Sequence, residues 1–289
     1  MATINHTMNW ITGKEFRDMA DFTFSLGDNT YHPGDVDNLP NTLDLSKLED
    51  GSIIYTHSMY TRQLFDTIRH VECRVIVITH NGDWNMDDSY VIPDCVDTWY
   101  AQNVNTYNPK VVSIPIGLEN PWWFVNEDKK GKMLAMLKKP KKIKNLVYVN
   151  HSRFTKPRPR IAAYQWFTGW QFATCKEGVN GHEFDDYLDN MYNHHFMCCP
   201  EGNGIDTHRT WEALYMGTIP IEIRNTNNRF YNDLPICFVD RWDECTLTFL
   251  ERELDRISRG KWNMDKLQMT YWKNLIYDKS KSLKKLCIA

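Results

Sequence analysis

Short apolar runs recur along this chain at intervals that fit buried strands. In the first half they predict strands at residues 51–57, 73–80, 96–103 and 110–120. Between the first two runs, residues 58–70 carry apolar side chains at helical spacing. A strand, a helix and a second strand in this order predict a parallel sheet flanked by helices. The first fifty residues show no comparable pattern.

The same alternation returns near residue 145 and continues toward the end of the chain. Strands are predicted at residues 145–152, 170–175, 196–199, 218–223 and 235–240. Helices are predicted at residues 158–169, 183–194, 206–217 and 246–279. The two halves therefore share one order of strands and helices, although no sequence repeat relates them.

Residues 127–145 separate the two halves by composition, because they are rich in lysine and poor in residues suited to a core. A solvated helix followed by a linker explains this segment better than a phosphate-binding patch does. We therefore predict a first domain at residues 1–130 and a second at residues 131–265, with a helix at residues 266–289 after them.

The composition indicates a folded protein and narrows its partners. Of its 289 residues, 42% are apolar and 13% are aromatic, which argues against a disordered chain. The net charge of -3 argues against a general nucleic-acid coat but leaves room for a local basic cleft. The eight cysteines form no CxxC pair, and no segment resembles a signal peptide or a membrane span. We expect a cytoplasmic protein with reduced cysteines, in the host cytoplasm if the protein is viral.

One stretch, CCPEGNGIDTHRTWEALYMGTIPIEI at residues 198–223, joins a glycine-containing turn to a helix. Gly202 and Gly204 permit backbone angles that other residues resist, and they let a ligand approach the main chain. Asp206 or Thr207 can cap the helix by accepting a hydrogen bond from an exposed N–H group. The stretch is therefore a candidate binding site.

This turn suits an anionic ligand, because free N–H groups and the positive end of the helix dipole point toward it. Arg209 can make a two-pronged contact with phosphate. Glu212 suits a ribose, because a carboxylate can accept hydrogen bonds from two adjacent hydroxyls. However, His208 and Glu212 can also form a surface pair, and glycine turns between a strand and a helix are common. Spacing alone leaves both a nucleotide-diphosphate site and an ordinary turn open.

The segment CPEGNGIDTHRTWEALYMGTIPI resembles the donor-binding motif of exostosin-like glycosyltransferases, and the segment LVYVNHSRFTKPRPR supports this more weakly. The short pieces YAQN and SIPIGLEN are also similar to parts of the first domain of such enzymes. The resemblance covers about half of the chain and implies an α/β fold of the GT-B type, with two Rossmann-like domains facing across a cleft. In that arrangement, the first domain binds the acceptor and the second binds the nucleotide sugar. The helix at residues 266–289 would return to the first domain.

The resemblance also implies roles for individual residues in the second domain. Glu212 should bind the ribose, and Arg209 should bind the diphosphate. Arg158 or Arg160 should contact phosphate, although Pro157 and Pro159 depart from the polar residues expected beside them. The other expected donor-site residues are Asn150, Ser152, Arg153, Gly202, Asn203, Gly204, Asp206, Thr207 and His208. The family implies no cofactor and no metal; the nucleotide-diphosphate sugar is a co-substrate.

An inverting transferase needs a base that takes the proton of the acceptor. The candidates are Asp83 and His80, which follow a predicted strand of the first domain. Asp83 can instead shape a turn, and His80 can be a hydrogen-bonded residue at the end of a sheet. A retaining mechanism would need no such base.

The leading hypothesis is a metal-independent, inverting glycosyltransferase that moves a hexosyl or pentosyl group from a nucleotide-diphosphate sugar to a glycan or related hydroxyl acceptor. One alternative is a viral-type transferase that acts on hydroxymethylated bases of DNA. Duplex DNA would then be a partner, and the negative net charge of the protein argues against this. Another is a non-catalytic nucleotide-sugar binder. A dehydrogenase ranks low, because no G-x-G-x-x-G follows an early strand.

Overall fold

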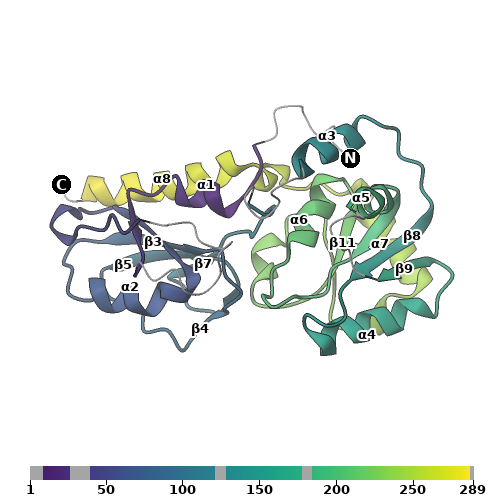
Figure 1. Ribbon diagram of the computed structural model, residues 1–289, viewed down its shortest axis with the longest axis horizontal. Coiled ribbons are helices and arrows are strands. Elements are labelled where there is room, and N and C mark those ends of the chain that lie inside the picture. The colour runs from purple at the N-terminus through teal and green to yellow at the C-terminus, as the bar shows by residue number, and fades with distance from the viewer. Residues whose placement is uncertain (1–8, 27–39, 121–127, 178–183, 287–289) are drawn as a thin grey trace. The chain divides into compact units, whose positions relative to one another are not determined.

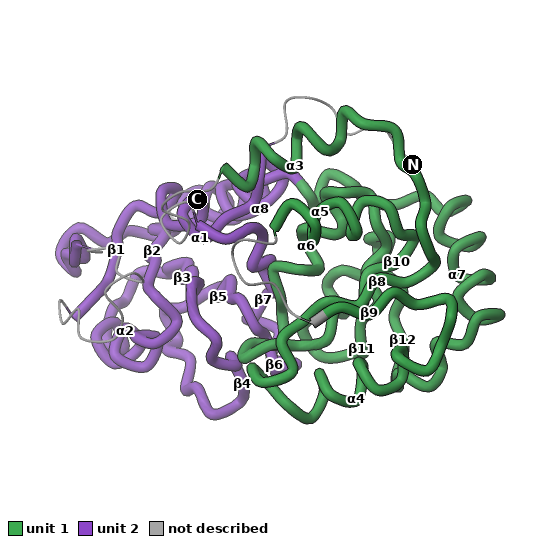
Figure 2. Tube along the Cα trace, turned by 45° about the vertical axis from the view of Figure 1, so that its right-hand side comes forward, with its two compact units in different colours: residues 1–8, 126–267 green, residues 9–125, 268–289 purple. Residues whose placement is uncertain are grey.

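The computed structural model describes residues 9–26, 40–120, 128–177 and 184–286. The chain divides into two compact units, which Figure 2 shows in different colours. Unit 1 holds the described residues from 128 to 267, and unit 2 holds those from 9 to 120 together with those from 268 to 286. The end of the chain therefore belongs to the same unit as its first half.

Unit 1 is built around a five-stranded parallel sheet. Its strands are β8 (Asn145–His151), β9 (Ala173–Glu177), β10 (His194–Cys198), β11 (Ile219–Ile223) and β12 (Cys237–Val239). Its helices are α3 (Lys129–Leu137), α4 (Pro157–Thr168), α5 (Phe184–Tyr192), α6 (His208–Tyr215) and α7 (Leu247–Arg259), with short 3-10 turns η5 (Asn228–Tyr231), η6 (Trp242–Glu244) and η7 (Met264–Leu267).

The strand order in this sheet is β12-β11-β10-β8-β9, so the direction of winding reverses between β8 and β10. This is the order of a doubly wound, Rossmann-like domain, in which the reversal marks the usual ligand site. Val147, Phe196 and Ile221 share one core cluster with residues of α4 and α7. On the opposite face of the sheet, the ring of Tyr148 has its centre 6.3 Å from that of Tyr187 on α5. The sheet is thus buried on both faces, which explains its continuous apolar runs.

Unit 2 is built around a second five-stranded parallel sheet, of order β1-β2-β3-β5-β7. These strands are β1 (Phe22–Phe24), β2 (Ile53–His57), β3 (Val75–His80), β5 (Val96–Ala101) and β7 (Val111–Ser113); β4 (Met86–Asp87) and β6 (Val104–Asn105) form a small separate pair. The helices are α1 (Gly13–Arg17), α2 (Thr61–Ile68) and α8 (Met269–Leu286), with 3-10 turns η1 (Leu45–Lys47) and η2 (Ser58–Tyr60).

The strands of unit 2 lie in the sheet in the order of the sequence. Because crossovers between parallel strands are right-handed, they all pass over the same face, and other segments must cover the opposite face. Figure 1 shows α2 on one side of this sheet and α1 with α8 on the other. The Ser280 hydroxyl on α8 donates to the Gly51 carbonyl at 2.6 Å, and Lys273 pairs with Glu15 of α1 at 2.7 Å. The terminal helix therefore completes a layer that this unit needs to bury β3 on both faces.

The predicted α/β class with Rossmann-like parallel sheets is confirmed, and the predicted strands after residue 50 are present. The predicted helix over residues 246–279 is instead two helices, α7 and α8, which are separated by Gly260 and η7. Sequence patterns missed α1, β1 and the β4–β6 pair. The cleft between two facing domains stays a prediction. Within the described residues, no helix is both long and apolar enough to cross a membrane.

Candidate functional site

The carboxyl ends of β8 and β10 lie side by side at the point where the winding of unit 1 reverses. Val147 and Tyr148 pair in register with Phe196 and Met197. β8 runs into a loop that leads to α4, and β10 runs into the glycine turn that leads to α6. In open α/β sheets, ligands bind outside the strand ends at this point. The fold thus brings the two predicted donor-site segments to one edge of one sheet.

Arg160 connects these two segments through hydrogen bonds. From the first turns of α4, its Nε donates to the Glu201 carbonyl at 2.9 Å and its Nη1 donates to the Ser152 carbonyl at 3.1 Å. A Cβ atom on Gly202 would lie 2.9 Å from Nη2, so a larger residue there would make the guanidinium shift. Burial, and secondarily the charge of Arg209, lower the pKa of Arg160 to about 10. This arginine stays charged at neutral pH and is enclosed by the turn.

The choice between the two candidate arginines of α4 follows from the structure. The Arg158 side chain is exposed, whereas that of Arg160 is buried. Pro157 and Pro159 have no N–H groups, so the first turn of α4 offers few main-chain donors to an anion. Arg160 is therefore the cation that α4 brings to the turn.

Arg209 stands at the start of α6, with its side chain partly buried. Its Nε is enclosed and has no hydrogen-bond partner among the described residues. Burial acts to lower the pKa of Arg209, but the nearby Tyr187, Cys199 and Glu212 outweigh it and raise that pKa. The guanidinium is thus a permanent charge with unused donor capacity, and it acts on the charge of the buried Arg160.

The turn before α6 is built differently from the expected cap. Thr207 occupies the N-cap position with extended backbone, but within the described structure its side chain accepts none of the N–H groups of the helix. The Asp206 carboxylate accepts from the Trp211 Nε1–H at 2.9 and 3.2 Å. Gly202 and Gly204 are buried, whereas Asn203 is exposed and His208 is partly buried.

Glu212 is buried one turn into α6, and its Oε2 accepts a hydrogen bond from the Tyr187 hydroxyl at 2.7 Å. Burial, followed by the charge of Glu212, raises the pKa of Tyr187 well above its usual value. Tyr187 therefore remains a donor and fixes the orientation of this carboxylate. It lies on α5, in a segment that sequence analysis had connected to no site.

The end of β8 adds two buried polar side chains. Asn150 donates through Nδ2 to the Tyr148 hydroxyl at 2.7 Å, and its Oδ1 is buried without a partner in the described structure. The His151 Nε2 lies 2.9 Å from the Arg160 carbonyl, and its Nδ1 is likewise buried and unpaired. Sequence analysis missed His151, although it stands between two predicted site residues. Ser152 accepts from the Phe154 N–H at 3.3 Å, and the Arg153 guanidinium lies 4.7 Å from the centre of the Tyr164 ring.

Glu222, at the end of β11, was not predicted as a site residue. Its Oε1 accepts from the Thr210 hydroxyl, and its Oε2 accepts from the Asn228 Nδ2 at 3.1 Å. Burial is the main cause that raises the pKa of Glu222 to about 7, with a further contribution from Asp206. A second carboxyl thus lies beneath the first turn of α6.

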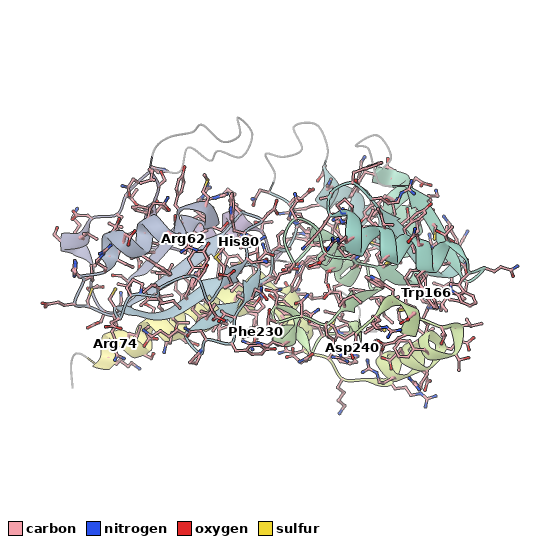
Figure 3. All side chains as sticks on the ribbon, turned by 90° about the horizontal axis from the view of Figure 1, so that it is seen from below. Arg62, Arg74, His80, Trp166, Phe230 and Asp240 are labelled. Atoms are coloured by element: carbon pink, nitrogen blue, oxygen red, sulfur yellow. The ribbon has the colours of Figure 1, made fainter. Side chains whose placement is uncertain are left out.

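The candidate base residues lie in unit 2, and Figure 3 shows His80 within that unit. The His80 ring is buried and stacks on Phe16, with ring centres 5.3 Å apart. Its Nε2 lies 3.0 Å from the Pro115 carbonyl, and its Nδ1 accepts from the Asn81 N–H at 2.8 Å. Both ring nitrogens therefore have protein partners.

Asp83 is exposed on the turn that follows β3. The turn begins at Asn81, which has a φ of 63° and is held by hydrogen bonds to Tyr55, Gln102 and Asn120. Burial lowers the pKa of the adjacent His57 to about 4, and the charge of Asp83 opposes this. The structure thus places an accessible carboxylate on a well-anchored turn.

Two other features bear on the expected ligands. Among the residues that the structure describes, no group of three or more His, Cys, Asp or Glu side chains is placed to hold a metal. In the lysine-rich segment, Lys141 donates to the Gly217 carbonyl at 2.7 Å and Lys144 pairs with Asp189 at 2.5 Å. Part of this positive charge is therefore engaged within unit 1.

No protein-family model matches the chain, and no curated protein matches it in sequence. Among solved structures, it is similar to an alpha1,3-fucosyltransferase, at 13% identity and a TM-score of 0.41 over 82% of this chain and 79% of that one. It is also similar to AviGT4, a glycosyltransferase involved in avilamycin A biosynthesis, at 11% identity and a TM-score of 0.37 over 81% and 85% of the two chains. A third is the pneumococcal O-GlcNAc transferase GtfA, at 8% identity and a TM-score of 0.32, over 82% of this chain and 54% of that one.

Proposed function

We propose that the protein is a glycosyltransferase that moves a sugar from a nucleotide-diphosphate sugar to a hydroxyl group of a glycan or related acceptor. The observation that carries the proposal is that Arg160, Arg209 and the Tyr187-oriented Glu212 all belong to the segments at the strand ends of unit 1. Two arginines that stay charged at neutral pH suit a diphosphate, and a buried carboxylate suits the two hydroxyls of a ribose.

The same residues account for the chemistry of the donor. As the glycosidic bond breaks, negative charge builds on the leaving diphosphate, and preorganised donors stabilise that charge best. Arg160 is held in place by two main-chain carbonyls, and Arg209 has an Nε without a partner in the described residues. We therefore propose that the arginines and the start of α6 take the role that a metal ion plays in other transferases.

The first test is a thermal-shift screen of the wild type and of Glu212→Gln against UDP, GDP, CMP, ADP and TDP sugars. A matching donor at about a hundred times its dissociation constant stabilises a protein by about 2.7 kcal/mol, so we expect the melting temperature to rise by several degrees. Glu212→Gln retains an oxygen for the Tyr187 hydroxyl but loses the charge, and we expect its affinity to fall about tenfold.

Glu251→Gln, which changes an exposed glutamate on α7, is the matched control and should bind the donor as the wild type does. A screen in which none of these donors shifts the wild type would overturn the proposal. Donor binding without transfer or donor hydrolysis would identify a nucleotide-sugar binder instead.

We further propose an inverting reaction in which Asp83 takes the proton of the acceptor. Asp83 is exposed, and the exposed ring of Trp84 beside it offers a flat surface on which a sugar can stack. Replacing Asp83 by asparagine should lower kcat about a hundredfold while donor affinity stays unchanged, because only the proton acceptor is removed. Turnover with several acceptor sugars, together with the anomeric configuration of the product, provides the measurement.

Asp94→Asn is the matched control for this substitution, because Asp94 is also exposed but precedes β5 at the opposite end of the sheet. It should leave turnover unchanged. Near-wild-type turnover of Asp83→Asn would exclude Asp83 as the base, and a retained configuration in the product would exclude an inverting reaction.

A further inference from the structure

His151 has a fixed tautomer and an unused nitrogen. Its Nε2 lies 2.9 Å from the carbonyl oxygen of Arg160, which can only accept, so Nε2 carries the hydrogen. In the neutral ring, Nδ1 is therefore an acceptor. It is buried and has no partner in the described structure. Leaving a buried polar atom unpaired costs free energy, which a ligand that pairs with it can recover.

The charges of three arginines act on this ring. Arg209 acts on it from α6, Arg160 from α4, and Arg153 from the intervening loop, while the Tyr164 ring lies 6.4 Å away, edge to face. Burial first, and then these charges, lower the pKa of His151 to about 4. Without a ligand, the ring is neutral at physiological pH, although it lies in a site that suits anions.

A bound diphosphate reverses these conditions. Its negative charge offsets the field of the arginines, and an opposite charge within about 4–6 Å favours the charged form of a titratable group. A protonated Nδ1 also becomes a donor, which suits a phosphate oxygen better than a lone pair does. The same nitrogen that is unpaired without ligand can therefore complete the phosphate contacts.

We propose that His151 takes up one proton from solvent when the diphosphate of the donor binds, and that its Nδ1–H then donates to a phosphate oxygen. This inference rests on the proposed function, because it concerns the same donor site. His151 thereby links donor affinity to pH and gives the leaving diphosphate an additional hydrogen bond. The alternative is a neutral ring whose Nδ1 accepts from a hydroxyl of the donor.

The test uses the full chain, labelled with 15N-histidine, and inorganic pyrophosphate as the probe. In the wild type at pH 6, we expect pyrophosphate to move the His151 Nδ1 resonance from the range of an unprotonated nitrogen to that of a protonated one. His194 is an internal control, because its Nδ1 lies 2.6 Å from the Asn190 carbonyl and its Nε2 lies 3.0 Å from the Thr174 hydroxyl. Its resonances should stay unchanged.

His151→Gln identifies the resonance and supplies the comparison in affinity. The glutamine amide can still donate to the Arg160 carbonyl, but it has no group that titrates. Between pH 5 and pH 6, the wild type should lose about tenfold more affinity for pyrophosphate than the variant, as one linked proton requires. The titration of pyrophosphate itself is common to both proteins and cancels in this comparison.

The outcomes separate the two proposals. If pyrophosphate binds while Nδ1 stays unprotonated, the proton uptake is refuted and the transferase proposal stands. If pyrophosphate does not bind to the wild type, the diphosphate site fails and both proposals fall with it. If His151→Gln does not fold, sequential assignment of the 13C,15N-labelled wild type identifies the His151 resonance instead, and that resonance decides between a protonated and a neutral ring.

Discussion

Replacing Arg209 by glutamine is expected to lower kcat/KM for sugar transfer about a thousandfold. The guanidinium combines a permanent charge with an enclosed Nε that has no partner in the described residues, and it stands at the first turn of α6. Removing one preorganised donor to a developing anion costs about 100- to 1,000-fold in rate, and the lost charge weakens the diphosphate contact further. Steady-state kinetics with the donor found by the thermal-shift screen measures the effect.

Two companion variants show whether this loss belongs to the phosphate contact. Arg209→Lys keeps the charge but loses the forked geometry, so it should recover part of the rate. Arg252→Gln, on the exposed surface of α7, should transfer sugar as the wild type does. If Arg209→Gln stays folded and retains transfer within tenfold of the wild type, Arg209 does not bind the diphosphate.

Much of the fold could be predicted because the signal is local. Strands buried on both faces, such as β3 and β8, appear in the sequence as uninterrupted apolar runs. The 3-residue strand β1 gives no such signal, because it becomes a strand by pairing with β2 across about thirty intervening residues. The break between α7 and α8 is also hard to locate, since Gly260 alone is compatible with a longer helix.

The chemistry of the residues alone predicted the candidate donor site only within one contiguous segment, whereas the site residues after β8 followed from the family resemblance. The glycine turn, Arg209 and Glu212 lie within one segment and follow from the chemistry of a helix start. Tyr187 contacts Glu212 from α5, 25 residues earlier in the sequence, and no local sequence pattern predicts such a contact. Arg160 could not be separated from Arg158 by sequence, because the choice depends on which side of α4 faces the turn.

Glu222 is a second residue whose contacts come from distant parts of the sequence, and we expect it to affect stability. Glu222 lies near the end of β11, and its carboxyl contacts Thr210 of α6 and Asn228 of η5. These three residues come from separate elements and meet only in the folded unit. The pKa of the group, about 7, lies above its usual 4.5 because of burial. The folded protein therefore holds this proton to higher pH than the unfolded chain does, so this carboxyl lowers stability progressively as pH rises from about 4.5 to about 7.

Glu222→Gln is accordingly expected to stabilise unit 1 at alkaline pH and to have little effect at pH 4.5. A shift from 4.5 to about 7 corresponds to roughly 3 kcal/mol at 1.36 kcal/mol per unit, and this difference develops as pH rises between those two values. The amide keeps an acceptor for Asn228, while Thr210 can turn its hydroxyl to accept. Hydrogen exchange of β10 and β11 in increasing urea, at pH 5 and pH 8, measures the opening of this unit. Glu251→Gln should show no comparable change with pH, and a Glu222→Gln protein that is no more stable than the wild type at pH 8 would show that the carboxyl is already well solvated or compensated when charged.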